Sequence, residues 1–384
     1  MPRVGFQGKR LAQARKVRML TQKSLADLIG KSSQAVSQYE SEKAEPSYEV
    51  VQDLAEVLRV PAALFYKPWD DHGSSSPVFS HSMAAATKRA REAAQSKLEW
   101  IDDVVAYFEE NLDLPQFTEF DFGLPEDPML IDDGMIEDAA MKVREMWGLG
   151  DGPIDNMIGV MERHGIFVFK LPLGADTLDA LSADWNEGHP YVVIGTDKGT
   201  PFRWRFDAGH ELGHLVLHRH VPEKSLRTSE LNKIIENQAH RFSSAFLMPE
   251  ETFVDSLTAV TLDSYKQMKP YWRCSIQAMI RRTKDLGVIG EDDYRRLNVG
   301  ISRRKWRKVE PFDLNAPEER PALARKCLAV IQSSFNASED EFYNATCLPL
   351  DFGRELFGDA FKSHDKREAI VLNFTNGMTQ VKQG

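Results

Sequence analysis

The sequence has little cysteine and no long apolar run. Among its 384 residues are three cysteines, Cys274, Cys327 and Cys347, and none stands in a CxxC spacing. This excludes a disulfide scaffold and a cysteine-based metal site, and it indicates a reducing compartment. No segment approaches the ~20 apolar residues of a membrane span, and the opening residues MPRVGFQGKRLAQ lack the apolar core of a signal peptide. We therefore expect a cytoplasmic protein with no membrane partner.

Positive charge is also scarce, and it is unevenly placed. The formal net charge of -10 disfavours general affinity for nucleic acid, and the 42% hydrophobic and 28% charged content is typical of globular domains. Residues 1–66, however, carry ten Lys and Arg against seven Asp and Glu, whereas residues 101–140 hold thirteen Asp and Glu and no Lys or Arg. We interpret this acidic stretch as a solvated linker. The alternative is that it mimics DNA phosphate or folds back on the basic N-terminal segment.

A motif with metal-binding spacing lies near the middle of the chain. Residues 210–214 read HELGH, and residues four apart share one face of a helix, so His210 and His214 can offer two imidazole nitrogens to one zinc ion. Glu211 lies beside that face, where a carboxylate can take a proton from water that the metal activates. The flanks are apolar, which favours a buried helix, and Asp207 is the expected N-cap. The alternative is an amphipathic helix with ordinary polar histidines.

A catalytic zinc site needs a third protein ligand. The next stretch with an apolar face at helical spacing, residues 230–248, offers Glu236 as the best third ligand and Glu230 as the fallback. His240 sits one turn from Glu236 on the same side. We interpret it as a residue that supports the ligands or the core, the alternative being that it competes as a ligand. We interpret His218 as structural.

These two helices resemble the ImmA/IrrE metallopeptidases. Residues 205–219 read RFDAGHELGHLVLHR, and residues 236–249 follow E-x-x-A-x-x-F-x-x-x-F-L-M-P. The resemblance implies a zinc-dependent metalloendopeptidase of the HExxH, gluzincin-like kind. Carried over residue by residue, it implies zinc binding by His210, His214 and Glu236, and a catalytic base at Glu211. The chain departs from the family at Gly209, where alanine is usual, and at His240, where asparagine is usual.

The residues before the HELGH motif predict a small sheet. Residues 136–147 and 153–163 have helical periodicity, and IFVFKL (166–171) is typical of a buried strand by its length and β-branched content. Residues 178–185 and 190–195 predict two more strands. An edge strand beside the zinc helix can hold an extended peptide by backbone hydrogen bonds, and residues 178–183 are our candidate for it. Among His240, Tyr265 and Arg241 we expect a donor to the carbonyl oxygen of the substrate.

The basic N-terminal segment predicts a run of short helices. Thr21 is expected to cap the second helix, which ends near Gly30, and Ser32 or Ser33 and then Ser47 open the next two. Two helices joined by a tight glycine-containing turn form a helix-turn-helix, whose second helix enters the major groove. The polar residues expected to face base edges are Ser33, Gln34, Ser37 and Gln38. Those expected to meet phosphates are Arg10, Arg15, Lys23 and Lys31.

The run TQKSLADLIGKSSQAVSQYESEKAEPS resembles the XRE/Cro helix-turn-helix of phage repressors. The resemblance implies binding to double-stranded DNA, with Gln22 bracing the recognition helix and a phosphate. Because such domains commonly pair on two half-sites, it also implies a homodimer. One departure is Glu42, which stands two residues after Glu40 where glycine is usual. The alternative is a helical module kept for protein contacts.

The sequence thus predicts a multidomain, mostly α protein with a small sheet. A helix-turn-helix domain (1–68) is followed by a linker helix and acidic stretch (69–135), an α+β zincin-like metallopeptidase domain (136–250), and a helical and mixed C-terminal region that senses or docks a partner (251–384). We predict a zinc-dependent endopeptidase that cleaves a repressor-like or antitoxin-like protein and regulates transcription in a stress or mobile-element/toxin–antitoxin response. The alternative is a non-proteolytic transcriptional regulator or antitoxin whose zinc site is structural or sensory.

Overall fold

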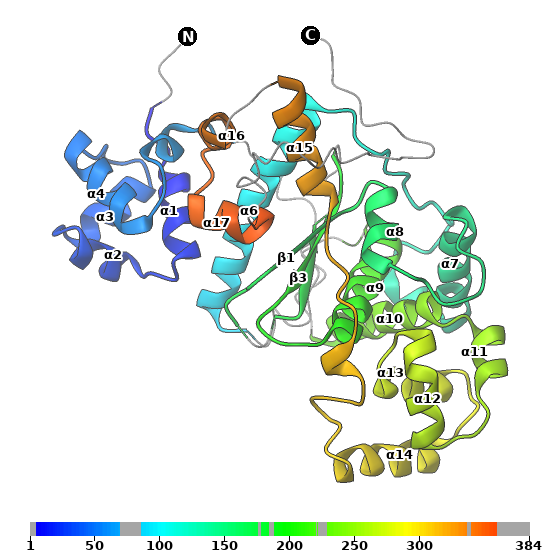
Figure 1. The fold of residues 1–384 in the computed structure, drawn as a ribbon. Coiled ribbons are helices and arrows are strands. Elements are labelled where there is room, and N and C mark those ends of the chain that lie inside the picture. The colour runs from blue at the N-terminus through cyan, green and yellow to red at the C-terminus, as the bar shows by residue number, and fades with distance from the viewer. Residues whose placement is uncertain are drawn as a thin grey trace.

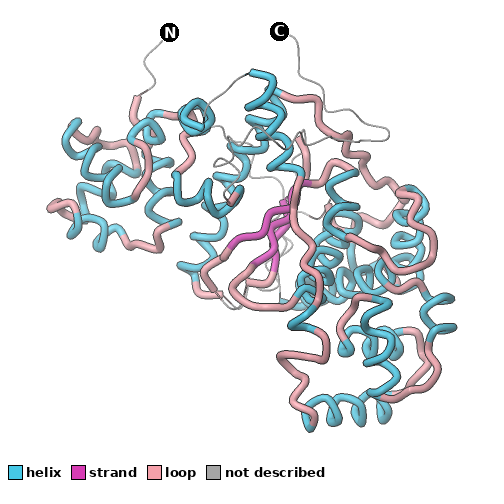
Figure 2. Tube along the Cα trace, in the orientation of Figure 1, coloured by secondary structure: helices cyan, strands magenta, loops and turns pink. Residues whose placement is uncertain are grey.

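The computed structural model describes residues 5–69, 86–175, 178–183, 188–219, 221, 229–335 and 339–358. These residues form several domains that are mostly helical and share one small sheet (Figure 1; Figure 2), so the predicted fold class is confirmed. Of the linker helix and acidic stretch expected at residues 69–135, residues 70–85 lie outside the described residues. No helix in the described ranges is both long enough and apolar enough to cross a membrane.

Short capped helices make up the N-terminal part. Side-chain oxygens of Thr21, Ser32 and Ser47 accept hydrogen bonds from backbone N–H groups in the first turns of the second, third and fourth helices, so these predicted caps are confirmed. Gly30 follows the second helix with a φ of 63°, which glycine adopts at little steric cost. The elements are α1 (Gly8–Val17), α2 (Gln22–Leu28), α3 (Ser33–Glu40), α4 (Tyr48–Leu58) and the 3-10 helix η1 (Ala62–Tyr66).

The sheet has three strands in the order β1-β3-β2 within the described chain. β1 (Phe167–Leu171) runs parallel to the central strand β3 (Tyr191–Gly195), and β2 (Ala180–Ala183) runs antiparallel to β3. In this register Phe167 pairs with Tyr191, and Leu181 pairs with Val193. β2 therefore forms an edge of the described sheet, where the sequence placed its candidate edge strand.

The sheet separates two hydrophobic cores. Tyr191 and Val193 of β3 contribute to one core, and Val192 and Ile194 contribute to the other, because successive side chains of a strand point to opposite faces. The first core joins β1 and β3 to the N-terminal helices and to four later helices, α6 (Lys88–Asn111), α15 (Leu323–Phe335), α16 (Glu339–Thr346) and α17 (Leu350–Phe357). Within it, the Tyr191 hydroxyl donates to the Asp102 carboxylate and also lies 3.1 Å from the Leu98 carbonyl oxygen.

The second core contains the predicted metal motif. It is built on the opposite face of the sheet, and its helices are all drawn on the same side of β1 and β3 in Figure 1. Its helices are α7 (Asp133–Met146), α8 (Met157–Arg163), α9 (Pro201–Leu217), α10 (Ser229–Leu247), α11 (Glu250–Ser256), α12 (Leu262–Trp272), α13 (Ile276–Asp285) and α14 (Glu291–Arg303). The 3-10 helix η2 (Pro128–Leu130) packs against α10.

A buried ion cluster closes the far end of this core. The Lys269 ammonium on α12 lies 2.7 Å from a Glu310 carboxylate oxygen and 2.5 Å from an Asp313 carboxylate oxygen, and all three side chains are buried. Asp313 begins the 3-10 helix η4 (Asp313–Asn315). A buried ammonium with two carboxylates is well paired, so this cluster holds η4 against α12.

The helix-turn-helix docks on α6 through buried polar contacts. The Arg10 guanidinium makes two hydrogen bonds to the Asp103 carboxylate at 2.7 and 3.0 Å, and the Lys67 ammonium lies 2.9 Å from the same carboxylate. The Trp100 indole N–H donates to Gln13 on α1 at 3.1 Å. Asp103 belongs to the acidic stretch, so that stretch is not wholly a solvated linker. It contacts the basic segment through Arg10 of α1 and through Lys67.

Glu162, at the end of α8, holds the start of α15 from across the structure. Its carboxylate accepts hydrogen bonds from the backbone N–H groups of Ala322 and Leu323 at 2.9 to 3.0 Å. Burial raises the pKa of Glu162 to about 7, although these backbone hydrogen bonds oppose the shift. A carboxyl group whose pKa is raised in the folded state stabilises the fold below its ordinary pKa, and that contribution is lost as the pH rises through the raised value.

We expect this loss to be measurable as a difference between the wild type and Glu162→Gln, because glutamine does not titrate. From pH 4.5 to pH 8 the free energy of unfolding of the wild type, relative to the variant, should fall by about 3 kcal/mol. Urea unfolding at several pH values measures the difference. The exposed variant Glu126→Gln serves as the control and should follow the wild type. Parallel curves for the wild type and Glu162→Gln would contradict the expected titration.

Candidate metal centre and DNA-binding surface

The metal motif lies on α9, a buried helix that begins earlier than the sequence indicated. Thr200 precedes the helix and Pro201 is its first residue, a position where the missing N–H of proline costs nothing. The expectation that Asp207 caps this helix is therefore wrong, because Asp207 lies in its second turn. Most of the helix from Ala208 to Leu217 is buried against α10 and the sheet.

Two glycines let α9 and α10 approach closely. A Cβ atom on Gly213 would lie 3.1 Å from the Ala239 backbone, and one on Gly209 would lie 2.6 Å from the Ser243 hydroxyl. Ser243 in turn donates to the Phe206 carbonyl at 2.9 Å. The departure at Gly209 from the usual alanine thus has a physical reason, since the Ser243 hydroxyl occupies the space that a methyl group would need.

The close approach brings Glu236 of α10 to the two imidazoles. The Nε2 atoms of His210 and His214 are 3.1 Å apart, and the Glu236 carboxylate lies 3.1 Å from the first and 3.6 Å from the second. Two donor atoms on one tetrahedral zinc, each at about 2.0–2.1 Å from the metal, are about 3.3 Å apart. The spacing of the three donors and their nitrogen and oxygen chemistry therefore fit a zinc ion. Glu230, the fallback ligand, is exposed in the first turn of α10.

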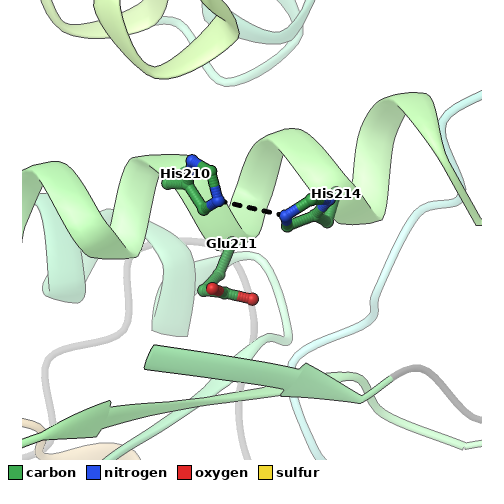
Figure 3. A group of neighbouring side chains, drawn as sticks. All are labelled: His210, Glu211 and His214. Atoms are coloured by element: carbon green, nitrogen blue, oxygen red, sulfur yellow. Dashed lines mark hydrogen bonds between the residues drawn. The ribbon is translucent and has the colours of Figure 1, made fainter. Parts of the chain in front are cut away.

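Glu211 points from α9 toward the sheet, whereas the two imidazoles lie side by side along the helix (Figure 3). Ligand atoms of His210, Glu211 and His214 lie within 4.8 Å of one another, so Glu211 is also near the donors. Its carboxylate accepts a hydrogen bond from the Ser182 hydroxyl of β2 at 2.5 Å. Burial raises the pKa of Glu211 well above its ordinary value, and the Ser182 hydrogen bond opposes that shift. Because Glu236 contacts both imidazoles and Glu211 is bonded to Ser182, the third-ligand position fits Glu236 better.

Ser182 is a site residue that the sequence analysis missed. It is the polar member of β2, whose other residues are alanine and leucine, and it is buried. A hydroxyl in an otherwise apolar strand beside a metal motif was the available signal. The partner of Ser182 was not deducible, because Glu211 lies 29 positions further along the chain.

The remaining candidate residues near the motif differ in exposure and in hydrogen-bond partners. His240 is exposed, and its ring meets the His210 ring at 4.7 Å between centroids. Of the other two expected donors to a substrate carbonyl, Tyr265 donates to Thr283 at 2.9 Å and Arg241 donates to Asp133 at 2.9 Å. His218, interpreted as structural, is buried with Nδ1 3.0 Å from Nδ1 of His214. Burial lowers the pKa of His214 well below its ordinary value and that of His218 to about 4.

The helix-turn-helix presents its recognition helix to solvent. The polar residues that the sequence placed opposite base edges are all exposed on α3: Ser33, Gln34, Ser37 and Gln38. The Gln22 amide donates to the Glu40 carboxylate at 2.7 Å, and Arg15 holds the same carboxylate. Gln22 thereby contacts the end of α3. The expectation that Arg10 meets a phosphate is wrong, because Arg10 is 3% exposed and bonded to Asp103.

Glu42 occupies the place of a glycine without loss of the turn. Its φ is 56°, in the left-handed region that glycine usually fills. Its carboxylate accepts a hydrogen bond from the backbone N–H of Gly8 at 3.0 Å, at the first turn of α1. A carboxylate is favourable at a helix N-terminus, so this contact offsets the backbone strain and directs the charge toward α1.

Two known protein families match parts of this chain. The family model of the IrrE N-terminal-like domain matches residues 161–284, and a helix-turn-helix family model matches residues 11–65. No curated protein matches the chain. The first match spans α8 to α13, including the sheet, α9 and α10, and its family is metallopeptidase-like. The chain therefore joins a helix-turn-helix to a metallopeptidase-like domain, and the fusion predicted from the motifs is confirmed.

We expect Gly213→Val to separate α9 from α10, because its branched side chain meets the Ala239 backbone. Moving Glu236 away from the imidazoles should weaken zinc binding at least about tenfold, and the strain should lower stability by about 1–3 kcal/mol. Competition with a chelator measures the affinity. The control is Gly300→Val on α14, where a Cβ atom meets the Leu262 side chain at 2.7 Å. It should cost stability only. Zinc affinity unchanged in Gly213→Val would show that this helix contact does not set the site.

Proposed function

We propose that this chain is a zinc-dependent endopeptidase coupled to a DNA-binding domain. In our proposal it hydrolyses a peptide bond in a specific repressor-like or antitoxin-like protein in the cytoplasm, and so regulates transcription in a stress or mobile-element/toxin–antitoxin response. The observation that carries the proposal is the convergence of His210, His214 and Glu236 at the spacing of a tetrahedral zinc site, with Glu211 beside them.

In this proposal the residues divide the chemistry between them. His210, His214 and Glu236 would hold a zinc ion, which supplies Lewis acidity that activates water and polarises a peptide carbonyl. The Glu211 carboxylate accepts a proton from the attacking water as the new C–O bond forms. It then delivers that proton to the amide nitrogen as the C–N bond breaks. The Ser182 hydroxyl at 2.5 Å holds the Glu211 carboxylate in place between these two transfers.

The substrate would lie along the sheet edge. β2 is an edge strand of the described sheet and carries Ser182, which contacts Glu211, so a peptide added to β2 as a further strand passes the base. Exposed His240 beside His210 is our choice for a hydrogen-bond donor to the scissile carbonyl oxygen. The carboxylate of Glu211 beside the three proposed ligands supports a peptidase over a structural zinc site, because a structural site needs no base next to the metal.

We expect Glu211→Gln to keep the metal and lose cleavage, because an amide does not accept a proton. Co-expression with the product of the neighbouring gene, with and without a chelator, should show metal-dependent fragments for the wild type. Loss of the base should reduce the cleavage rate by about 10²–10⁴-fold. Glu230→Gln, a change of the same type at an exposed position in the first turn of α10, is the control. Wild-type cleavage by Glu211→Gln would remove Glu211 as the base. Bound zinc without any cleavage by the wild type would favour a structural or sensory zinc site.

We also propose that α3 reads double-stranded DNA, with the chain as a homodimer on two half-sites. Gln34 is exposed on α3 and suits a base edge, whereas exposed Lys31 suits a phosphate. Gln34→Ala should therefore lose about 1–3 kcal/mol of preference for one base pair. Lys31→Ala should weaken all sequences alike and reduce the salt dependence by about one ion. Fluorescence titration with a duplex from upstream of its own gene measures both effects. Equal effects of the two variants on all sequences would contradict base recognition by Gln34.

A further inference from the structure

A chain of buried polar groups runs from the loop before α7 to the metal centre. The Gln238 amide nitrogen lies 2.7 Å from the Pro128 carbonyl oxygen and 3.0 Å from the Ile131 carbonyl oxygen. The Gln238 amide oxygen lies 2.9 Å from Nε2 of His218, and Nδ1 of His218 lies 3.0 Å from Nδ1 of His214. Gln238 is 5% exposed, and both histidines are fully buried. Each link is therefore a hydrogen bond without competing water.

The two backbone carbonyls that Gln238 contacts determine the direction of these hydrogen bonds. A backbone carbonyl only accepts hydrogen bonds, so the end of Gln238 that faces two carbonyls must be its NH₂ group. The other end is then the amide oxygen, which also only accepts. Nε2 of His218 must therefore carry a proton and donate it to Gln238.

The same direction continues through the two imidazoles. With its proton on Nε2, the neutral His218 ring has a lone pair on Nδ1, which accepts from its neighbour. Nδ1 of His214 must then carry the proton of that ring and donate it across the 3.0 Å contact. The remaining nitrogen, Nε2 of His214, keeps its lone pair, and it is this atom that lies near His210 and Glu236.

We propose that Gln238 and His218 are positioning residues that keep Nε2 of His214 free of a proton and aimed at the metal. This inference rests on the proposed zinc site. We call the hydrogen bonds that link Gln238, His218 and His214 the relay. If these hydrogen bonds ran in the opposite direction, Nε2 of His214 would carry a proton. That proton would oppose metal binding, because a histidine ligand binds through an unprotonated nitrogen. The two carbonyls that set the direction lie at residues 128 and 131, before the matched segment 161–284. The loop between α6 and α7 is thus part of the metal centre.

The first test is the position of the proton in the zinc-free protein. Imidazole nitrogen chemical shifts of the full chain, labelled at histidine, distinguish a proton on Nδ1 from one on Nε2. The His214 resonance is identified by its loss in His214→Ala. We expect His214 protonated on Nδ1 and His218 on Nε2 in the wild type. In Gln238→Met, which fills similar volume without an acceptor, both rings should lose this preference. A wild-type His214 protonated on Nε2 would overturn the proposal.

The second test is zinc affinity measured by chelator competition. Gln238→Met and His218→Leu should lose about 10–100-fold. His218→Asn should recover most of the loss, because its side-chain oxygen can accept from Nδ1 of His214 while its NH₂ group faces Gln238. The control is Ser243→Ala on the same helix α10, which removes one hydrogen bond, to the Phe206 carbonyl, outside the relay. It should stay within about threefold of the wild type, since it leaves the support of the ligand intact.

The variants and readouts separate the relay from simple packing and from the function. Far-ultraviolet circular dichroism confirms that each variant is folded. Equal losses in His218→Leu and His218→Asn, or in Gln238→Met and Ser243→Ala, would overturn the proposal in favour of packing. If the wild type binds no zinc, the proposed function fails, and the relay is still judged by the proton positions in the zinc-free protein. If zinc binds without cleavage, only the peptidase assignment fails.

Discussion

Gly213 allows α9 and α10 to pack backbone against backbone, and the contacts that α10 makes at the candidate metal centre follow from that approach. A side chain at this position would press on Ala239 from 3.1 Å away. Because the helices lie so close, Glu236 reaches both imidazoles from a helix that is separate in sequence, and Gln238, two residues on, reaches His218. The absence of a side chain at Gly213 thus lets α10 bring the proposed third ligand, Glu236, and the proposed positioning residue, Gln238, close to the imidazoles of α9.

Local sequence patterns were sufficient to predict much of the fold and, at the candidate site, the pairing of His210 with His214. The cap residue Thr21, the glycine after α2, and the length and β-branched content of the β1 segment are cues that act over a few residues. The sequence alone therefore predicted α2 and β1. His210 and His214 share a face through helical spacing alone. The contacts of Ser182 and Gln238 join residues far apart in the chain, and no local rule pairs them. The expected cap at Asp207 failed because α9 begins at proline, another local cue that was available.

The two predicted activities are placed on opposite sides of one sheet. The core that contains the helix-turn-helix, α6 and the C-terminal helices uses one face of β1 and β3, and the core that contains the metal motif uses the other (Figure 1). The buried pair of Arg10 and Asp103 joins the helix-turn-helix to α6, which itself packs on the sheet. Removing one partner of a buried pair leaves a costly charge, so this docking resists disruption. The recognition helix α3 remains exposed in the docked arrangement.

The apolar central strand β3 leaves the register of the sheet to be fixed by polar contacts. Both faces of β3 are apolar, so burial alone scarcely distinguishes the observed pairing from one shifted by a single residue. Two hydroxyl groups make the difference. The Tyr191 hydroxyl donates to Asp102 and lies near the Leu98 carbonyl oxygen in the first core, whereas the Ser182 hydroxyl donates to Glu211 on the other side of the sheet. A slipped sheet would leave both hydroxyls without acceptors, at about 1–3 kcal/mol each. The Ser182 hydroxyl, which holds the proposed base, therefore also helps to fix the register of the strands.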